Sequence, residues 1–100
     1  MLKHIVMLKL KDEAKGASAA ENAVKLKTML DALVGKIAEI RSLEVGINLF
    51  SNRQTAHLSL YAEFDSEEDL NRYANHPDHQ RVVAFLQQVM DERRVVDYHA

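Results

Sequence analysis

The stretch Leu2-Lys3-His4-Ile5-Val6-Met7-Leu8-Lys9-Leu10 decides the fold, because aliphatic side chains occur in both of its alternating rows. Successive side chains of a β-strand point to opposite faces of the sheet. One row runs from Leu2 to Leu10 and is aliphatic except for His4, while the other places Ile5 and Met7 between lysines. The pattern therefore predicts a strand that is buried on both faces, with a histidine in its more apolar row.

A long amphipathic helix is predicted next. The stretch Ser18-Ala19-Ala20-Glu21 has the pattern of a capping box, in which Ser18 accepts a hydrogen bond from the helix and Glu21 reaches back. Apolar side chains then recur every three or four residues, which places them on one helix face. They are Ala23, Leu26, Leu30, Leu33, Ile37 and Ile40. We therefore expect a helix that runs as far as Ile40 and packs on a flat layer.

Two further strands are predicted at 43–50 and 56–64, because apolar and polar residues alternate in both segments. The polar stretch Ser51–Gln54 supplies the turn between them. Short alternating segments joined by a polar turn are typical of antiparallel neighbours in one sheet.

A second helical region is interrupted by the only proline of the chain. Ser66 caps a short helix, while Pro77 disfavours helix at the residue before it and starts a new helix that runs to about Asp91. The segment 94–98 is rich in β-forming residues. The order β-α-β-β-α-β is the ferredoxin-like arrangement, so we predict an α+β fold with a four-stranded antiparallel sheet, formed as one domain by residues 1–100.

Composition restricts the classes of function. Among 100 residues, 13 are Lys or Arg and 15 are Asp or Glu, and this balance argues against a nucleic-acid-binding module. The lack of cysteine excludes disulfides, thiol catalysis and thiolate metal sites. Apolar runs such as Ile5–Leu8 are too short to cross a bilayer. We therefore expect a cytoplasmic protein with neither a nucleic acid nor a membrane as its partner.

The sheet is expected to need a second covering layer. Helices on one face of a four-stranded sheet leave the other face open. Here that face is not polar, because both rows of the first strand contain aliphatic residues and Phe50 lies opposite the aliphatic row of the second strand. Large apolar patches mark interaction sites, so we predict a homodimer in which sheet packs against sheet.

Two histidines flank the proline. His76 is expected near a helix cap and His79 in the first turn of the last helix, where the helix dipole favours the neutral imidazole that a general base requires. Alternatively, His76 caps backbone amides and His79 simply packs against the first strand. A metal site that adds His4 or His57 as a third ligand is a further alternative. No Asp or Glu stands convincingly beside these histidines, so we predict no metal.

His4, His57, Tyr73 and His79 are polar groups in apolar surroundings on four separate segments. An unpaired buried polar group costs on the order of 1–3 kcal/mol. We therefore expect these side chains to be satisfied by one another, by water or by a ligand, and to contribute to one site.

Five segments together resemble the stress-responsive A/B barrel domain family over nearly the whole chain. They are Lys3–Lys11, Leu43–Gly46, Glu63-Phe64, Tyr73 with His76-Pro77-Asp78-His79, and Val95–Tyr98. The resemblance implies a dimeric α+β barrel in which two ferredoxin-like sheets face each other.

A plant polyketide cyclase within this family catalyses an intramolecular aldol condensation without a cofactor. By resemblance, its catalytic tyrosine and histidine fall on Tyr73 and His79, and two further pocket histidines fall on His4 and His57. This implies that His79 would remove a proton beside a carbonyl while Tyr73 hydrogen-bonds the carbonyl oxygen. No cofactor is expected.

Three functions follow as hypotheses. The first is binding of a hydrophobic carbonyl or phenolic small molecule, with His4, His57 and His76 as ligand-binding candidates. The second is a cofactor-free cyclase, isomerase or monooxygenase that uses His79 and Tyr73 as catalytic residues. The third is a stress-associated structural oligomer in which the histidines satisfy one another. An apolar cavity against Tyr73 and His79 would favour the first two hypotheses.

Overall fold

The computed structural model describes residues 1–52 and 54–100 of the chain. The long strands form a four-stranded antiparallel sheet in the order β4-β5-β1-β6, and β2 and β3 form a separate small hairpin. The elements are β1 (Leu2–Leu10), β2 (Glu13–Ala14), β3 (Ala17–Ser18), α1 (Ala19–Asp31), β4 (Ser42–Ile47), β5 (Leu58–Phe64), α2 (Glu67–Asn75), α3 (Pro77–Val89) and β6 (Met90–His99). The ferredoxin-like α+β fold predicted from the sequence is confirmed.

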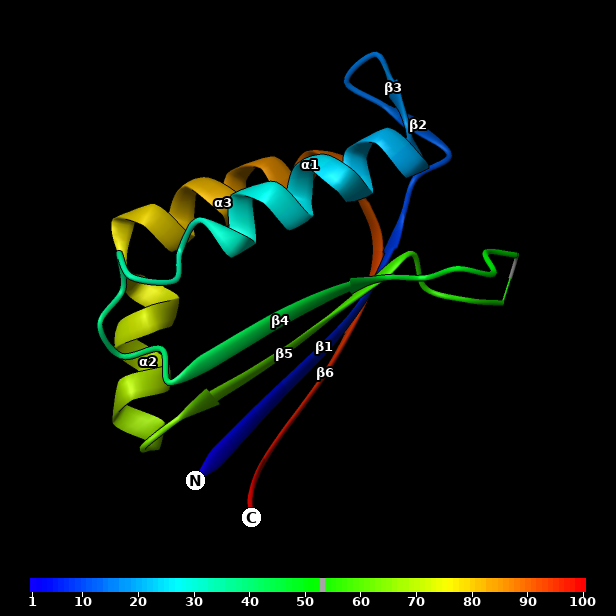
Figure 1. Cartoon of the computed structure of the whole chain (residues 1–100). Helices are drawn as coiled ribbons and strands as arrows, with labels where there is room; N and C mark the ends of the chain where they lie inside the picture. Colours follow the sequence, from blue (N-terminus) through cyan, green and yellow to red (C-terminus); the bar gives the residue numbers. More distant parts are fainter. Residues whose placement is uncertain (53) are drawn as a thin grey trace.

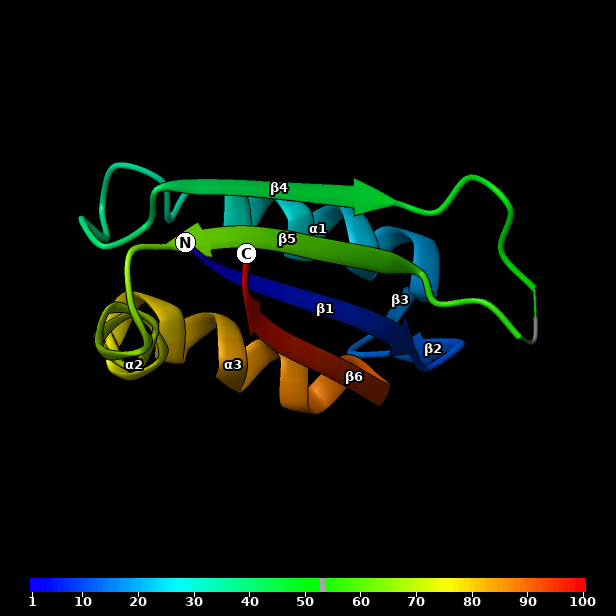
Figure 2. The ribbon, with the colours of Figure 1, turned by 90° about the horizontal axis from the view of Figure 1, so that it is seen from below.

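The helices lie on one side of the four-stranded sheet and leave its other face open (Figures 1 and 2). β1 is a central strand, because His4 pairs with Ala62 of β5 on one side and with Asp97 of β6 on the other. The row of β1 that faces the helices is buried, and Val6 and Leu8 are 5% and 3% exposed. The other row is only partly buried, and Met7 is 50% exposed, so the prediction of a strand buried on both faces is correct for one face of this chain only.

The first helix begins as predicted but ends earlier. Ser18 Oγ accepts a hydrogen bond from the Glu21 amide at 3.1 Å, and the Glu21 carboxylate accepts one from the Ser18 amide at 3.0 Å. α1 stops before Gly35, whose φ of +87° lies in the left-handed region that a regular helix excludes. Leu33 and Ile37 are nevertheless 3% and 1% exposed, so turns rather than helix complete the apolar stripe. No helix in the described ranges is long and apolar enough to cross a membrane.

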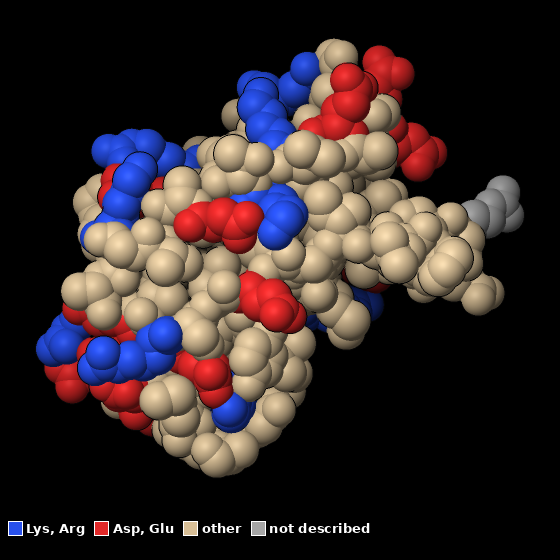
Figure 3. Space-filling model, in the orientation of Figure 1, with Lys and Arg blue, Asp and Glu red and all other residues tan. Residues whose placement is uncertain are grey.

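The connection between β4 and β5 also differs from the prediction. The strand predicted over 43–50 ends at Ile47, opposite Leu58 of β5, and one further backbone hydrogen bond, from the Asn48 amide to the His57 carbonyl at 2.9 Å, leads into the loop. Leu49 and Phe50 lie in the projecting loop and are 86% and 80% exposed. Figures 1 and 3 show how this loop projects from the rest of the molecule, and the one Lys, Arg, Asp or Glu in its sequence is Arg53, which lies outside the described residues.

The last strand is longer than the segment 94–98 predicted from the sequence. β6 runs from Met90 to His99 and pairs along the whole of β1, with an irregularity at Lys9/Leu10. Pairing with β1 therefore holds the charged residues at the start of β6 in a strand, although their β-propensity is too low to predict one from the sequence.

The open face of the sheet is partly apolar, as the sequence indicates. Met7 and Val96 are 50% and 52% exposed there, and Tyr98 is 44% exposed. An ion pair between Lys3 and Glu63 lies beside this patch. Exposed apolar groups on a sheet face are typical of a surface that binds another protein layer.

Candidate functional site

A pocket of about 290 Å³ lies between the sheet and the helices. Its walls are mainly aliphatic, and its polar lining residues are His4, Tyr73, His79, Gln87 and Arg93. At the density of liquid water, this volume holds on the order of ten non-hydrogen atoms. The pocket therefore suits a compact, largely apolar molecule.

β1 and β6 hold His4 beside Asp97 at this pocket. The two residues are register partners on adjacent antiparallel strands, so their side chains point to the same side of the sheet. His4 is 7% exposed, and its Nδ1 lies 2.5 Å from Asp97 Oδ1. A carboxylate can only accept hydrogen bonds, so Nδ1 carries a proton, and the lone pair of the neutral ring is on Nε2.

Tyr73 forms the inner wall of the pocket. It lies on α2 and is only 1% exposed, and its ring centroid is 5.0 Å from that of Phe64 and 6.3 Å from that of His4. Its hydroxyl makes no hydrogen bond with any residue in the described ranges. Burial raises the pKa of Tyr73 to about 12, an effect that the positive charge of Arg93 partly offsets. The hydroxyl is therefore protonated at neutral pH and available as a donor.

Pro77 separates α2 from α3 and sets the direction of the second helix. His76, immediately before it, has an extended backbone (φ −66°, ψ 136°), as expected for a residue that precedes proline. His76 Nδ1 accepts a hydrogen bond from the Asp78 amide at 3.1 Å and so caps α3. His76 does not line the pocket. Its placement agrees with the capping alternative rather than with its expected ligand-binding role.

His79 lies in the first turn of α3 and faces Tyr73, with their ring centroids 4.3 Å apart. The Ala74 carbonyl lies 3.0 Å from His79 Nδ1 and can only accept, so Nδ1 donates and the neutral ring has its lone pair on Nε2. Burial lowers the pKa of His79, and the charges of His4, Arg93 and His76 lower it further, against the opposing effect of the Ala74 hydrogen bond. The imidazole is therefore poised as a neutral base.

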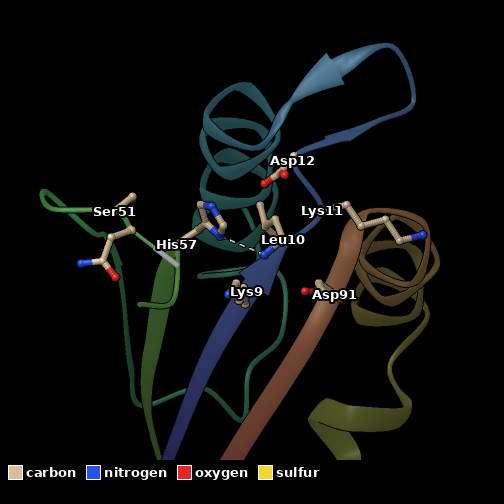
Figure 4. Close-up of a pocket in the computed structure, with 8 residues that line it drawn as sticks. Lys9, Leu10, Lys11, Asp12, Ser51, His57 and Asp91 are labelled. Atoms are coloured by element: carbon tan, nitrogen blue, oxygen red, sulfur yellow. Dashed lines mark hydrogen bonds between the residues drawn. The ribbon is translucent and has the colours of Figure 1, made fainter. Parts of the chain in front are cut away.

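His57 lies away from this pocket, which corrects the expectation that four polar groups gather at one place. Its Nδ1 accepts a hydrogen bond from the Leu10 amide at 2.9 Å, at the far end of β1 (Figure 4). Leu10 and His4 are separated along β1 by about 20 Å at the usual strand rise. His57 instead lines a polar depression together with Lys9, Asp12 and other residues. Antiparallel register, which alternation alone does not fix, determines this separation.

Two polar residues of the pocket region, Asp97 and Arg93, were not assigned to the site from the sequence. Both belong to the row of β6 whose register partners on β1 are His4 and Leu8, which face the helices. Alternation through 93, 95 and 97 was the available signal. It was missed because the predicted strand began at 94 and its neighbours are charged on both faces.

The arrangement provides a donor, a neutral base and a histidine held by a carboxylate around an apolar volume. Tyr73 can donate to an oxygen, and His79 Nε2 can accept a proton. Within the described residues, no cluster of three or more His, Asp or Glu side chains could hold a metal ion. The side chains around the pocket are suited to binding a ligand oxygen and to transferring a proton.

Fold and pocket together define a class of small α+β domains with a ferredoxin-like sheet and a pocket between the sheet and its helices. Comparison of the sequence with family models leads to the same class of protein. The chain belongs to the stress responsive A/B barrel domain family, whose model matches residues 2–100.

Relatives agree with this assignment. A stress-response A/B barrel domain-containing protein, DABB1, from Arabidopsis thaliana is 26% identical over 110 residues, which cover all of this chain and 47% of that protein. The chain thus spans about half the length of this relative. A protein of unknown function from Bacteroides fragilis, described as dimeric and ferredoxin-like, is 35% identical with a TM-score of 0.84, covering 99% of this chain and 95% of that one. A hydroxynitrile lyase from Passiflora edulis shares the fold at 15% identity and a TM-score of 0.78, covering 97% and 90%.

Proposed function

We propose that this protein binds a compact hydrophobic molecule with a carbonyl or phenolic oxygen in the pocket between sheet and helices. One observation carries the proposal: Tyr73 is 1% exposed as a residue, and its hydroxyl, which opens onto the mainly aliphatic pocket, has no hydrogen-bond partner among the described residues. Leaving such a group unpaired costs on the order of 1–3 kcal/mol. A ligand oxygen that accepts its hydrogen bond removes this cost.

His79 and Tyr73 offer complementary hydrogen-bonding atoms to such a ligand. The Tyr73 hydroxyl donates to a carbonyl oxygen, whereas His79 Nε2 accepts from a phenolic hydroxyl. The rest of the ligand fills the space bordered by Leu26, Leu30 and Val82. Small-molecule sites usually combine a few polar groups, which orient the ligand, with mainly apolar walls around the rest of it.

A homodimer is part of this proposal. The open face of the sheet exposes Met7, Val96 and Tyr98, and burial of these groups against a second copy is favourable by about 25 cal/mol per Å² of apolar surface. The Bacteroides fragilis relative is described as dimeric. A two-fold arrangement of identical sheets is the simplest closed assembly for this surface.

The binding proposal is tested with acetophenone and ethylbenzene, which have the same carbon skeleton and differ in the carbonyl oxygen. Titrations followed by NMR give the affinity of each for the wild type, for Tyr73→Phe and for Tyr61→Phe. Tyr61 is the matched control, because its hydroxyl lies 3.4 Å from Glu63 on the open face. We expect Tyr73→Phe, but not Tyr61→Phe, to lower the affinity for acetophenone by about fivefold, and we expect neither substitution to change the affinity for ethylbenzene. Equal effects of the two variants, or no binding by the wild type, would contradict the proposal.

A second candidate function is cofactor-free proton abstraction at carbon. The specific observation is the neutral His79 base beside the Tyr73 donor. His79 Nε2 takes the proton as the C–H bond beside a carbonyl breaks, and the resulting enolate oxygen keeps the hydrogen bond from Tyr73. The lyase from Passiflora edulis is an enzyme with this fold.

Exchange of the acetophenone methyl protons in D2O tests this second function without a known substrate. We expect exchange above the buffer rate that is lost in His79→Gln and kept in His76→Gln. Exchange no faster than in buffer, in a protein that binds acetophenone, leaves binding as the function. Failure of both acetophenone experiments favours the structural oligomer.

A further inference from the structure

Among the described residues that line the pocket, Arg93 alone carries a fixed charge. It lies on β6 in the row that faces the helices, opposite Leu8 of β1. β6 is an edge strand, so the other side of Arg93 has no neighbouring strand among the described residues. The guanidinium therefore stands beside an aliphatic wall rather than beside a carboxylate.

No described residue forms an ion pair or hydrogen bond with Arg93. The next residue provides a direct contrast, because Arg94 points to the opposite face and binds Glu92 at 3.2 Å. Of the two acids that alternate with Arg93 along β6, Asp97 is already bound to His4, and Asp91 forms no ion pair with Arg93. An unpaired guanidinium at an otherwise apolar pocket favours an anion at this position.

Arg93 is exposed, whereas Tyr73 at the inner wall is 1% exposed. The charge thus lies at the mouth of the pocket and the unpartnered hydroxyl lies at its base. Both groups line the same pocket, and the positive charge of Arg93 lowers the pKa of Tyr73 and of His79. A ligand that satisfies both has its anionic group at the entrance and an apolar body inside.

We propose that the pocket takes an amphipathic carboxylic acid, whose carboxylate binds the Arg93 guanidinium at the mouth while its apolar part occupies the interior. This inference rests on the proposed binding function and names its ligand class. A carboxylate matches the planar guanidinium with two parallel hydrogen bonds, which a neutral amide cannot form. The pocket volume limits the buried part to on the order of ten non-hydrogen atoms, so the acid is a compact one.

The test compares 4-phenylbutanoate with 4-phenylbutanamide, which differ in charge but share the buried phenylpropyl group. Affinities are measured by isothermal titration calorimetry for the wild type, Arg93→Gln and Arg94→Gln. Both substituted side chains are exposed within one chain, so the fold of the chain is retained. Because Arg94 lies on the open face opposite Met7, light scattering must show that Arg94→Gln keeps the assembly state of the wild type. We expect the wild type to prefer the acid by about fivefold, a preference that only Arg93→Gln abolishes. Added salt should lower the affinity for the acid and leave the affinity for the amide unchanged.

The outcomes separate this inference from the function on which it rests. Equal affinities of acid and amide in the wild type overturn the carboxylate assignment while leaving small-molecule binding in place. A preference for the acid that Arg94→Gln removes as well as Arg93→Gln also overturns it, because general surface charge then explains the effect. Absence of binding by both compounds overturns the assignment, and acetophenone binding then decides whether the proposed function also fails.

Discussion

The rings of Tyr73 and His79 lie with their centroids 4.3 Å apart and their planes inclined at 46°, although the two residues belong to different helices. Pro77 produces this relationship, because it ends one helix direction and starts the next between them. The result is a hydrogen-bond donor and a proton acceptor on one wall of an apolar pocket.

The unpartnered hydroxyl of Tyr73 has a consequence for stability. Tyr73→Phe removes a group that gains no hydrogen bond from the fold, so we expect the free energy of unfolding to stay the same or rise by up to about 1 kcal/mol. Tyr73→Ala, by contrast, leaves a cavity and should lose about 3–5 kcal/mol. Urea denaturation measures both values. A loss of 1 kcal/mol or more in Tyr73→Phe would mean that the hydroxyl has a partner in the fold.

The lowered pKa of His79 predicts a pH dependence of stability. The folded protein binds the His79 proton more weakly than the unfolded chain, whose reference pKa is 6.5. Stability is therefore unaffected by this group well above pH 6.5 and falls as the pH drops below it. We expect His79→Gln to show a smaller loss of stability than the wild type between about pH 7 and 5. Identical pH profiles of the two proteins in urea denaturation would contradict this interpretation.

The bond between His4 and Asp97 should stabilise the β1–β6 pair. Asp97→Asn replaces a charged acceptor by an amide, and we expect it to lower the free energy of unfolding by about 1 kcal/mol. Asp91→Asn, an exposed change on the same strand, is the control and should stay within about 0.5 kcal/mol of the wild type. Nitrogen NMR of His4 should also report a proton on Nδ1 in the wild type. A proton on Nε2 alone would rule out the assigned tautomer.

Self-association through the open sheet face is tested by a pair of charge substitutions. Met7 on that face and Val24 on α1 are 50% and 57% exposed, so neither residue is buried within one chain. We expect the wild type and Val24→Glu to be dimers by light scattering, and Met7→Glu to be monomeric because it places charge in the interface. A monomeric wild type, or a Met7→Glu dimer, would count against sheet-to-sheet packing.

The sequence was sufficient for the order of the elements and for part of the site. Periodicity identified the strands, and Tyr73 and His79, two of the four polar groups expected at one site, lie next to each other. His57 was misplaced because alternation gives the face of a residue but not its position along a paired strand. The helix end before Gly35 was missed because the apolar spacing continues through buried turns. The place of Arg93 in a strand was missed because the sequence predicts that strand only from residue 94, whereas pairing with β1 extends β6 back to Met90.

The most direct test of the central claim is the infrared carbonyl stretch of acetophenone labelled with carbon-13 at its carbonyl, bound to the protein. A hydrogen bond from Tyr73 weakens the carbonyl bond and lowers its stretching frequency. We expect the bound ligand to absorb at a lower frequency in the wild type than in Tyr73→Phe, where the donor is absent. The same frequency in both proteins would contradict the proposed binding mode, because the ligand oxygen would then accept no hydrogen bond from the Tyr73 hydroxyl.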